Sequence, residues 1–356
     1  MKITFQLSFL MAILFLSTTA IAQSLTLPAA SPYAKITQRV GITDISITYN
    51  SPAMKGREVW GKLVPYGEIW RAGANDNTVI SISDDVKIEG KAIAAGEYGV
   101  HIIPNETSAT VIFSTATSSW GSYTYDEKED ALRVEVTPVS VPSQEWLTFD
   151  FNDRGNDFAV ARLAWGNRAI PFKIEVDVHN TVIGNFKDEL RSQKRYQWES
   201  WHQAAQYCLA NDINLEQGLE WVDYSINGMF RSQSNFSNLS TKAGILNKLG
   251  KTAEAKATMG EAINHPTADA SGLYSYGRQL ISEKNLEEAL SIFQSSKERF
   301  PDHWLSDHGL ARAYSAMGKF DKAIEHEMVG LERAPANSKR FLEGYMEKLK
   351  KGEDFN

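Results

Sequence analysis

The residues best suited to binding chemistry lie in the stretch from Ser51 to Asn77, which is rich in glycine and aromatic side chains. Tryptophan faces stack on sugar rings or peptide groups, and guanidinium, carboxamide and carboxylate groups hydrogen-bond to the same ligands. The sequence therefore predicts a ligand-binding site here. Its candidate residues are Arg57, Glu68, Trp70, Arg71, Asn75 and Asp76.

A structural interpretation of the same stretch stays open. A long connection inside a compact domain either carries function or packs as a cover over the end of the domain. In the second case, Trp60 and Trp70 cap a hydrophobic core, and the arginines pair with nearby carboxylates, for which the candidates are Glu58, Glu68 and Asp76.

The catalytic motifs in this sequence are incomplete, which favours a protein that is not an enzyme. Residues 56–62 match the spacing G-x-x-x-x-G-K, but Leu63 stands where a phosphate loop needs a hydroxyl. The seven histidines lack metal-ligand spacing. Cys208 lies in a helical pattern, where a small buried hydrophobic residue is expected. We therefore predict no catalytic residue, no cofactor and no metal site.

Length and charge limit the remaining classes of protein. The chain has 356 residues, 42% of them hydrophobic and 23% charged, which suits two globular domains. Its formal net charge is −7, so the clustered positive charge that nucleic-acid binding requires is not expected.

The first 22 residues have the pattern of an export signal. Lys2 precedes an apolar run that ends near Leu16, and Ala20-Ile21-Ala22 is typical of a cleavage site. We expect a signal peptide at 1–22, cleavage near Ala22-Gln23, and a periplasmic or secreted mature chain. No later stretch is long and apolar enough to predict a transmembrane segment.

Alternating hydrophobic residues predict a β domain over 23–182. Ile45, Ile47 and Tyr49 alternate with polar residues, and the same pattern returns near 98–102, 132–136 and 147–151, and from 170 to Val178. Alternation with period two places one face of a strand in a core. Because no helices intervene, we expect an antiparallel β-sandwich or a partly open barrel.

The motifs of this half resemble a known bacterial family. Their order is Ser31-Pro32, Tyr49-Asn50-Ser51-Pro52, Gly61–Gly67, and then Trp70-Arg71-Ala72-Gly73-Ala74-Asn75. The chain resembles DUF2911, a family of exported proteins common in Bacteroidetes. The resemblance implies a β fold and export. The family has no known function, so the resemblance supplies no catalytic residue.

A regular repeat organises the second half, 183–350. Ala255, Ala289 and Ala323 recur at a constant interval, as do a second set of small residues, Ala243, Gly277 and Ala311. This interval and the small residues resemble the tetratricopeptide repeat (TPR), in which helix pairs of about 34 residues stack into a short α-helical solenoid. The clearest units span about 236–266, 270–301 and 304–335, and a degenerate unit is expected over 198–228.

Two features of the repeats depart from that pattern. Glu327 stands where a large apolar residue is usual, and Asp307 where an aromatic residue or leucine is usual. We also expect glycine or asparagine to supply a left-handed turn between the helices of each unit.

Two hypotheses for function follow from the sequence. The first is a non-catalytic binding or scaffold protein that holds a protein or peptide partner on its helical repeats. The alternative is a carbohydrate-binding module, or a weak glycan-directed hydrolase, that uses the connection at 56–77.

Overall fold

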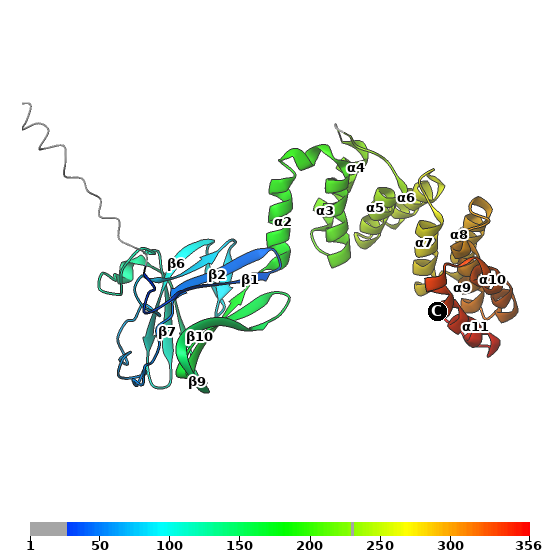
Figure 1. Ribbon diagram of the computed structural model, residues 1–356. Coiled ribbons are helices and arrows are strands. Elements are labelled where there is room, and N and C mark those ends of the chain that lie inside the picture. Colours follow the sequence, from blue (N-terminus) through cyan, green and yellow to red (C-terminus); the bar gives the residue numbers. More distant parts are fainter. Residues whose placement is uncertain (1–26, 229–230) are drawn as a thin grey trace, which may run out of the picture. The chain divides into compact units, whose positions relative to one another are not determined.

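The computed structural model describes residues 27–228 and 231–356, so the expected signal peptide at 1–22 and its cleavage site lie outside the described residues. The chain divides into two compact units, of which the first ends at Val182 and the second begins at Ile183. In Figure 1 the first unit contains the strands, and the second is built from helices.

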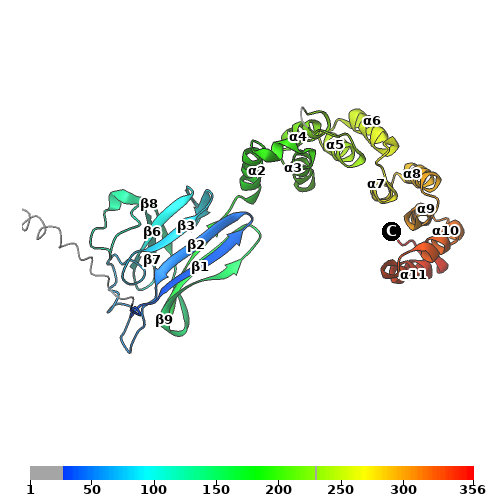
Figure 2. The ribbon, with the colours of Figure 1, turned by 45° about the horizontal axis from the view of Figure 1, so that its top comes forward.

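The strands of the first unit form two antiparallel sheets. One has the order β1-β2-β3-β6-β7-β8, and the other has the order β5-β4-β10-β9. Figure 2 shows the neighbouring strands of the first sheet side by side. The strands are β1 (Tyr33–Val40), β2 (Thr43–Asn50), β3 (Thr78–Ile82), β4 (Val86–Ile88), β5 (Lys91–Ile93), β6 (Gly96–Pro104), β7 (Ala109–Ser114), β8 (Asp130–Val136), β9 (Val139–Arg154) and β10 (Phe158–Glu175), and a short 3-10 helix, η1, spans Glu127–Glu129.

The two sheets share one hydrophobic core. Along β2 every second residue is buried, which matches the alternation seen in the sequence. Tyr49 of β2 packs on Phe149 of β9 with ring centroids 5.1 Å apart, and Phe113 of β7 packs on Phe172 of β10 at 5.7 Å. These pairs join one sheet to the other, so the predicted antiparallel sandwich is confirmed.

One strand boundary was wrong. The alternation through Val176 and Val178 predicted a strand to that point, but β10 ends at Glu175, and Val178 begins helix α2. The Asp177 side chain accepts from the backbone N–H of Asn180 at 3.1 Å, which starts a helix instead. The alternation of hydrophobic residues does not show that a side-chain hydrogen bond starts a helix at this point.

The second unit consists of helices with short connections, and α2 contains the boundary, since the first unit ends at Val182 within this helix. Among the described residues, no helix is long and apolar enough to span a membrane. The helices are α2 (Val178–Glu189), α3 (Trp198–Asn211), α4 (Leu215–Asn227), α5 (Phe236–Lys248), α6 (Thr252–Asn264), α7 (Ala270–Ser282), α8 (Leu286–Arg299), α9 (Trp304–Ala316), α10 (Phe320–Arg333) and α11 (Ala336–Lys350), with a 3-10 helix, η2, at Gln193–Tyr196.

The repeat period of the sequence corresponds to repeated helix pairs. Ala255, Ala289 and Ala323 are each the fourth residue of the second helix in a pair, and all three are buried. The first helices, α5, α7 and α9, carry Ala243, Gly277 and Ala311 at their eighth positions, also buried. Equivalent residues therefore occupy equivalent places, and the TPR-like architecture is confirmed.

The turns inside the three pairs are also equivalent, with one correction. A left-handed residue stands at Gly250 (φ 77°), Lys284 (φ 63°) and Gly318 (φ 71°). The sequence analysis expected glycine or asparagine here, but in the second pair Lys284 takes this conformation and Asn285 does not. A lysine in this region is strained, because its Cβ crowds the following carbonyl.

Before the clear repeats, α3 packs against α4 in the predicted degenerate unit. Ala204, Ala205 and Cys208 of α3 and Val222 of α4 lie in one buried cluster, which Ile245 of α5 joins. Burial raises the pKa of the Cys208 thiol to about 11, so this cysteine is a neutral core residue at physiological pH, as the sequence predicted.

Candidate functional site

Trp70 belongs to an aromatic cluster at the edge of the sandwich core. Its backbone pairs with Ile102 of β6, with N–H···O distances of 2.9 and 2.7 Å in the two directions. Its ring stacks on Trp165 and meets Trp60 edge-on, both at 6.1 Å, and Trp60 Nε1 donates to the Trp165 carbonyl at 2.9 Å. This part of the connection packs as a cover.

Arg57 and Glu68 are exposed on the same connection. The Arg57 guanidinium donates to the carbonyls of Ala53 and Met54, both at 2.8 Å, and so fixes the turn that precedes it. Glu68 stands two residues before Trp70 and is exposed to solvent. The pairing of Arg57 with a carboxylate, which the structural interpretation expected, does not form; its partners are backbone carbonyls.

Arg71, Asn75 and Asp76 converge on a different loop. The Arg71 guanidinium lies 5.9 Å from the ring centre of Trp120. The Asn75 carbonyl accepts from the backbone N–H of Gly121 at 3.3 Å, and Asp76 forms a backbone bridge with Trp120. Burial lowers the pKa of Arg71, and its Nε is buried without a hydrogen-bond partner. Half of the predicted residues thus surround Trp120.

This loop presents aromatic rings that the sequence analysis did not select. Trp120 is 63% exposed and Tyr123 is 82% exposed, and their rings stack with centroids 6.1 Å apart. The signal was present in the sequence as the run Ser118–Tyr125, where aromatic residues alternate with serine, glycine and threonine. Exposed aromatic faces of this kind suit stacking on a planar or sugar-like ligand.

A partly buried set of polar side chains lies at the base of the loop. His101 Nδ1 lies 3.0 Å from Ser122 Oγ, and burial lowers the pKa of His101. The Tyr125 hydroxyl donates to Asp130 at 2.6 Å, and Asp130 also accepts from Arg133 Nε. Burial, together with the hydrogen bond to Asp130, raises the pKa of Tyr125 to about 12. These hydrogen bonds hold the loop that carries Trp120 and Tyr123 in one conformation.

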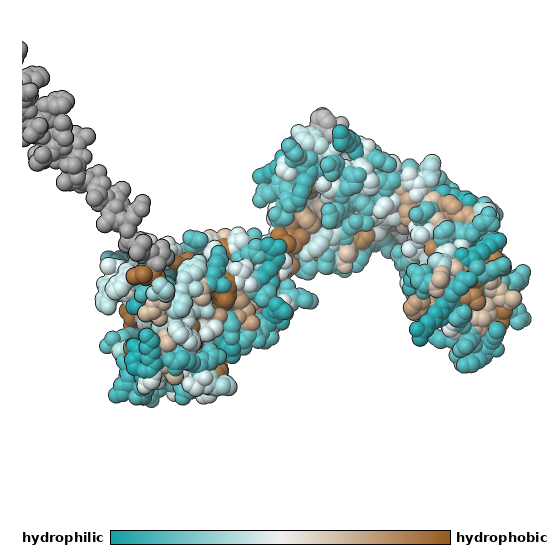
Figure 3. Space-filling view, in the orientation of Figure 1, coloured by the Kyte–Doolittle hydropathy of each residue, from teal (hydrophilic) through white to brown (hydrophobic). Residues whose placement is uncertain are grey.

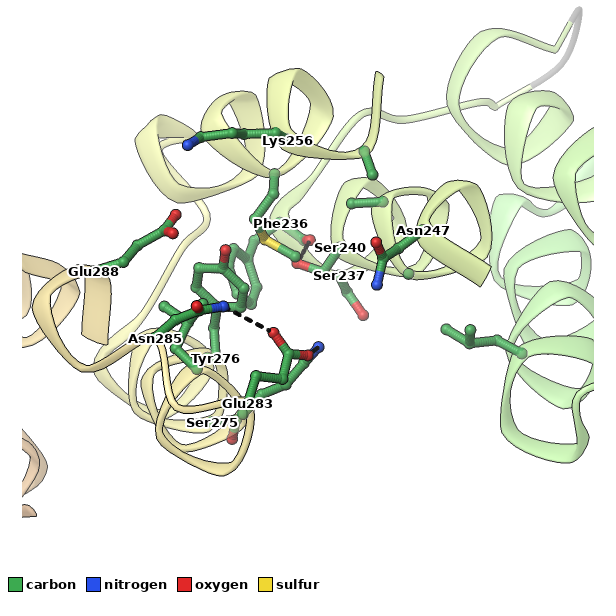
Figure 4. Close-up of a pocket in the computed structure, with 18 of the residues that line it drawn as sticks. Phe236, Ser237, Ser240, Asn247, Lys256, Ser275, Tyr276, Glu283, Asn285 and Glu288 are labelled. Atoms are coloured by element: carbon green, nitrogen blue, oxygen red, sulfur yellow. Dashed lines mark hydrogen bonds between the residues drawn. The ribbon is translucent and has the colours of Figure 1, made fainter. Parts of the chain in front are cut away.

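The helical unit contains a groove of about 610 Å³ between its first and second repeat pairs. Figure 4 shows Phe236, Ser237, Ser240 and Asn247 on α5, across the groove from Ser275 and Tyr276 on α7, with Lys256 of α6 and Glu288 of α8 at the same opening. The helical surface visible in Figure 3 is mainly hydrophilic. The lining of the groove is mixed, with serine, asparagine, lysine and glutamate side chains beside Phe236, Met259 and Leu280.

The groove offers hydrogen-bonding groups of both kinds. Asn247 is exposed and supplies an amide that donates and accepts. Burial, and then the charges of Glu288 and Glu283, raise the pKa of Tyr276 to about 12, so its hydroxyl stays protonated. Such groups match the alternating N–H and C=O of an extended peptide backbone.

Three positions of α5 that line the groove recur in the later repeats. One repeat later, Ser240, Gly244 and Asn247 are replaced by Tyr274, Arg278 and Ile281 of α7, and two repeats later by His308, Arg312 and Ser315 of α9. The open groove and the inner side of α9 are therefore the same surface in different repeats.

On α9 this surface is already occupied by residues 354–356, a segment without regular secondary structure. Ser315 Oγ donates to Asp354 at 2.6 Å, the Arg312 guanidinium donates to the Asn356 side chain at 3.0 Å, and the ring of Phe355 faces His308 at 5.8 Å. Phe355 is buried. The sequence analysis ended the helical domain at 350 and missed this segment, because a short and mostly polar stretch carries no periodic signal.

Comparison with known proteins identifies the first unit. Residues 31–174 match the family described as "Protein of unknown function (DUF2911)", so the chain contains a DUF2911 domain, as its motifs predicted. No curated protein matches the chain.

Solved structures resemble the helical unit at low similarity. YrrB, described as a TPR protein with an unusual peptide-binding site, is 16% identical, with 48% of this chain and 83% of YrrB covered and a TM-score of 0.33. The C-terminal part of a TPR repeat-containing protein from Cytophaga hutchinsonii is 16% identical, covering 49% and 73%, with a TM-score of 0.35. MamA from Desulfovibrio magneticus RS-1 is 16% identical, covering 45% and 90%, with a TM-score of 0.30. The equivalent helix positions described above establish the repeat architecture independently of these structures.

Proposed function

We propose that the helical unit binds an extended polypeptide segment in the groove between α5 and α7, and that the chain is a non-catalytic binding protein. One observation carries this proposal. The positions equivalent to Ser240, Gly244 and Asn247 hold residues 354–356 on α9, so this surface already accommodates a non-helical segment within the same molecule.

The side chains explain why a partner can enter at α5. Serine, glycine and asparagine leave space at the three positions, whereas on α9 the larger histidine and arginine stand at the first two of them. An extended peptide offers backbone donors and acceptors to Asn247 and Tyr276. Lys256 and Glu288, which carry opposite charges at the groove opening, favour a segment with both signs of charge.

Selection of peptides from a random displayed library on the full mature chain tests this proposal. Peptides selected by the natural chain should lose about tenfold or more in affinity for Asn247→Ala and for Ser237→Arg, since the first removes an amide partner and the second fills the groove. Fluorescence anisotropy of the selected peptides measures the loss.

Matched controls lie outside the groove. Asn264→Ala removes another exposed asparagine, on α6, and Ser282→Arg places the same bulk at an exposed serine on α7. Both should bind the selected peptides as the natural chain does. Selection that returns no specific peptide, or groove variants that bind as tightly as these controls, would reject the proposal.

We also propose that the protein acts outside the cytoplasm. The support is the pattern of residues 1–22, with a positive start, an apolar run and the small residues Ala20 and Ala22. N-terminal sequencing of the chain from a bacterial host should find Gln23 first. A chain in the cytoplasmic fraction that still begins at Met1 would contradict export.

A second candidate function, glycan binding, is favoured by the loop around Trp120. Its two exposed stacked rings stand beside Arg71, whose buried Nε has no protein partner, and beside Asn75 and Asp76. Aromatic faces with adjacent hydrogen-bonding groups are suited to sugar rings. The site differs from the predicted one in that Trp120, rather than Trp70, supplies the accessible face.

A glycan array probed with the full chain tests this second function. Any specific signal should disappear in Trp120→Ala and persist in Tyr33→Ala, which removes another exposed aromatic ring of the same unit. A signal that both variants lose equally, or no signal with the natural chain, would remove glycan binding from consideration.

A further inference from the structure

Residues 354–356 are bound on α9 through three different side-chain chemistries. The carboxylate of Asp354 accepts from Ser315 Oγ, whose oxygen also accepts the backbone N–H of Phe355 at 3.3 Å. The Phe355 ring stacks on Tyr345 of α11 with centroids 4.7 Å apart. The amide of Asn356 accepts from Arg312 and donates to the Arg312 carbonyl, each at 3.0 Å.

Arg312 is the centre of this site. It is 8% exposed, and its Nε donates to the Tyr274 hydroxyl at 2.8 Å and to His308 Nε2 at 3.3 Å. Its guanidinium carbon lies 5.3 Å from the ring centre of Tyr345 and 5.1 Å from that of Phe355. A buried cation needs acceptors and aromatic faces in place of water. Phe355 and Asn356 supply one of each.

The bound segment is joined to the helices by a short connection. α11 ends at Lys350, Gly352 turns the chain with φ 70°, and Glu353 N–H donates to the Lys348 carbonyl at 3.0 Å. Residues 351–354 and 356 are exposed, and Phe355 is the one buried anchor of this segment. Release of residues 353–356 therefore leaves every helix with its own backbone hydrogen bonds.

We propose that the site formed by Tyr274, His308, Arg312, Ser315 and Tyr345 is a recognition site for an Asp–aromatic–Asn sequence in a partner polypeptide. Residues 354–356 are its resident occupant, and the partner segment displaces them. The aromatic residue enters the space between Arg312 and Tyr345, and the acidic and amide side chains take the contacts of Asp354 and Asn356. Of the residues of this site only Tyr274 comes from α7, and it does not line the groove between α5 and α7, so the site stands even if that groove binds nothing.

The first experiment frees the site in the full chain. Phe355→Ala removes the ring that anchors the resident segment while keeping its backbone. A dye-labelled peptide of the sequence Lys-Lys-Gly-Glu-Asp-Phe-Asn, residues 350–356, is then titrated against this variant and the natural chain by fluorescence anisotropy. The variant should bind the peptide at least about tenfold more tightly, because in the natural chain the tethered segment competes at high effective concentration.

Two controls define the chemistry of recognition. The same peptide with alanine in place of phenylalanine should not bind the variant. Phe341→Ala, which removes an exposed ring elsewhere on α11, should leave the chain as weak a binder as the natural protein. Equal binding by Phe355→Ala and the natural chain, or no binding by either, would overturn the proposal, as would a Phe355→Ala chain that has lost its helical circular dichroism.

A second measurement needs no destabilising substitution. Fluorine-labelled phenylalanine at position 355 of the full chain reports by NMR whether the ring is buried or free. Addition of unlabelled peptide in excess should convert the buried signal into a free one. A signal that stays in the buried position at every peptide concentration would identify residues 354–356 as a permanent cap and would refute exchange.

Discussion

The first and third repeat pairs, α5–α6 and α9–α10, have equivalent helices and turns but different side chains on their inner surface. Both turn at a left-handed glycine, Gly250 or Gly318, and bury an alanine at the fourth residue of the second helix. On α5 and α6, Ser240 and Met259 both line the groove. Between α9 and α10 the same positions hold His308 and Glu327, whose side chains hydrogen-bond at 2.7 Å.

The second pair provides the intermediate case. There the positions hold Tyr274 and Phe293, whose rings lie 6.1 Å apart. The departures at Glu327 and Asp307 each place a buried carboxylate with partners of its own in the third pair, and Glu327 bonds to His308. Asp307 is buried and lies 2.8 Å from Lys297 and 3.3 Å from Arg333. The repeat period specifies the backbone, and a few facing side chains decide whether a pair offers a groove or a filled site.

The largest expected effect concerns Glu327, which is fully buried. Glu327→Ala leaves His308 without its partner and opens a cavity, and should lower the free energy of unfolding of the helical unit by about 3–5 kcal/mol. Met259→Ala is the matched change in the first pair, where the side chain is only half-buried, and should cost less. Urea unfolding followed by circular dichroism compares the two; equal losses would show that the pairs do not differ in this way.

A smaller effect is expected at Gly277. An added Cβ would lie 2.3 Å from Phe293, so Gly277→Ala should destabilise the unit by about 1–3 kcal/mol although alanine is natural at both equivalent positions. Gly344→Ala on α11 is the control, because its Cβ meets nothing within 4 Å, and it should stabilise the helix by roughly 0.5–1 kcal/mol. Thermal unfolding measures both, and a neutral Gly277→Ala would mean that Phe293 repacks freely.

A single substitution gives the turn of the second pair the left-handed glycine that the other two pairs have. Lys284→Gly should stabilise the helical unit by about 1 kcal/mol, since it removes the strain of a left-handed lysine. The reverse change, Gly318→Lys, should destabilise the third pair by a similar amount. Urea midpoints of the two variants should move in opposite directions; a shift of the same sign in both would contradict this account of the turn.

The smallest effect is expected in the degenerate unit before the first pair, where Cys208 of α3 lies in one buried cluster with Ile245 of α5. Because burial raises the pKa of Cys208 to about 11, its contribution to stability is complete below about pH 9 and is lost as pH rises from 9 towards 11. Cys208→Ala should be less stable at neutral pH and should show a shallower decline over this range. Parallel pH profiles for the two chains would show that the thiol does not contribute.

Much of the fold could be predicted because its signals are local and repeated. Ile45, Ile47 and Tyr49 alternate, and Ala255, Ala289 and Ala323 recur once in every repeat, so each pattern samples one face of an element many times. The positions of the candidate site residues could be predicted only in part. Arg71, Asn75 and Asp76 do converge, but the exposed face that they surround belongs to Trp120, which lies far along the chain from all three.

By itself, the sequence determined the two units, the DUF2911 domain and the repeat period, because burial of regularly spaced apolar or small side chains defines strands and helix pairs. Tertiary structure alone decided that Trp70 packs in a cover while Trp120 faces solvent, and that Phe355 fills a site on α9. The physical reason is that exposure and pairing depend on which distant segments meet, and no spacing within a single element records those contacts.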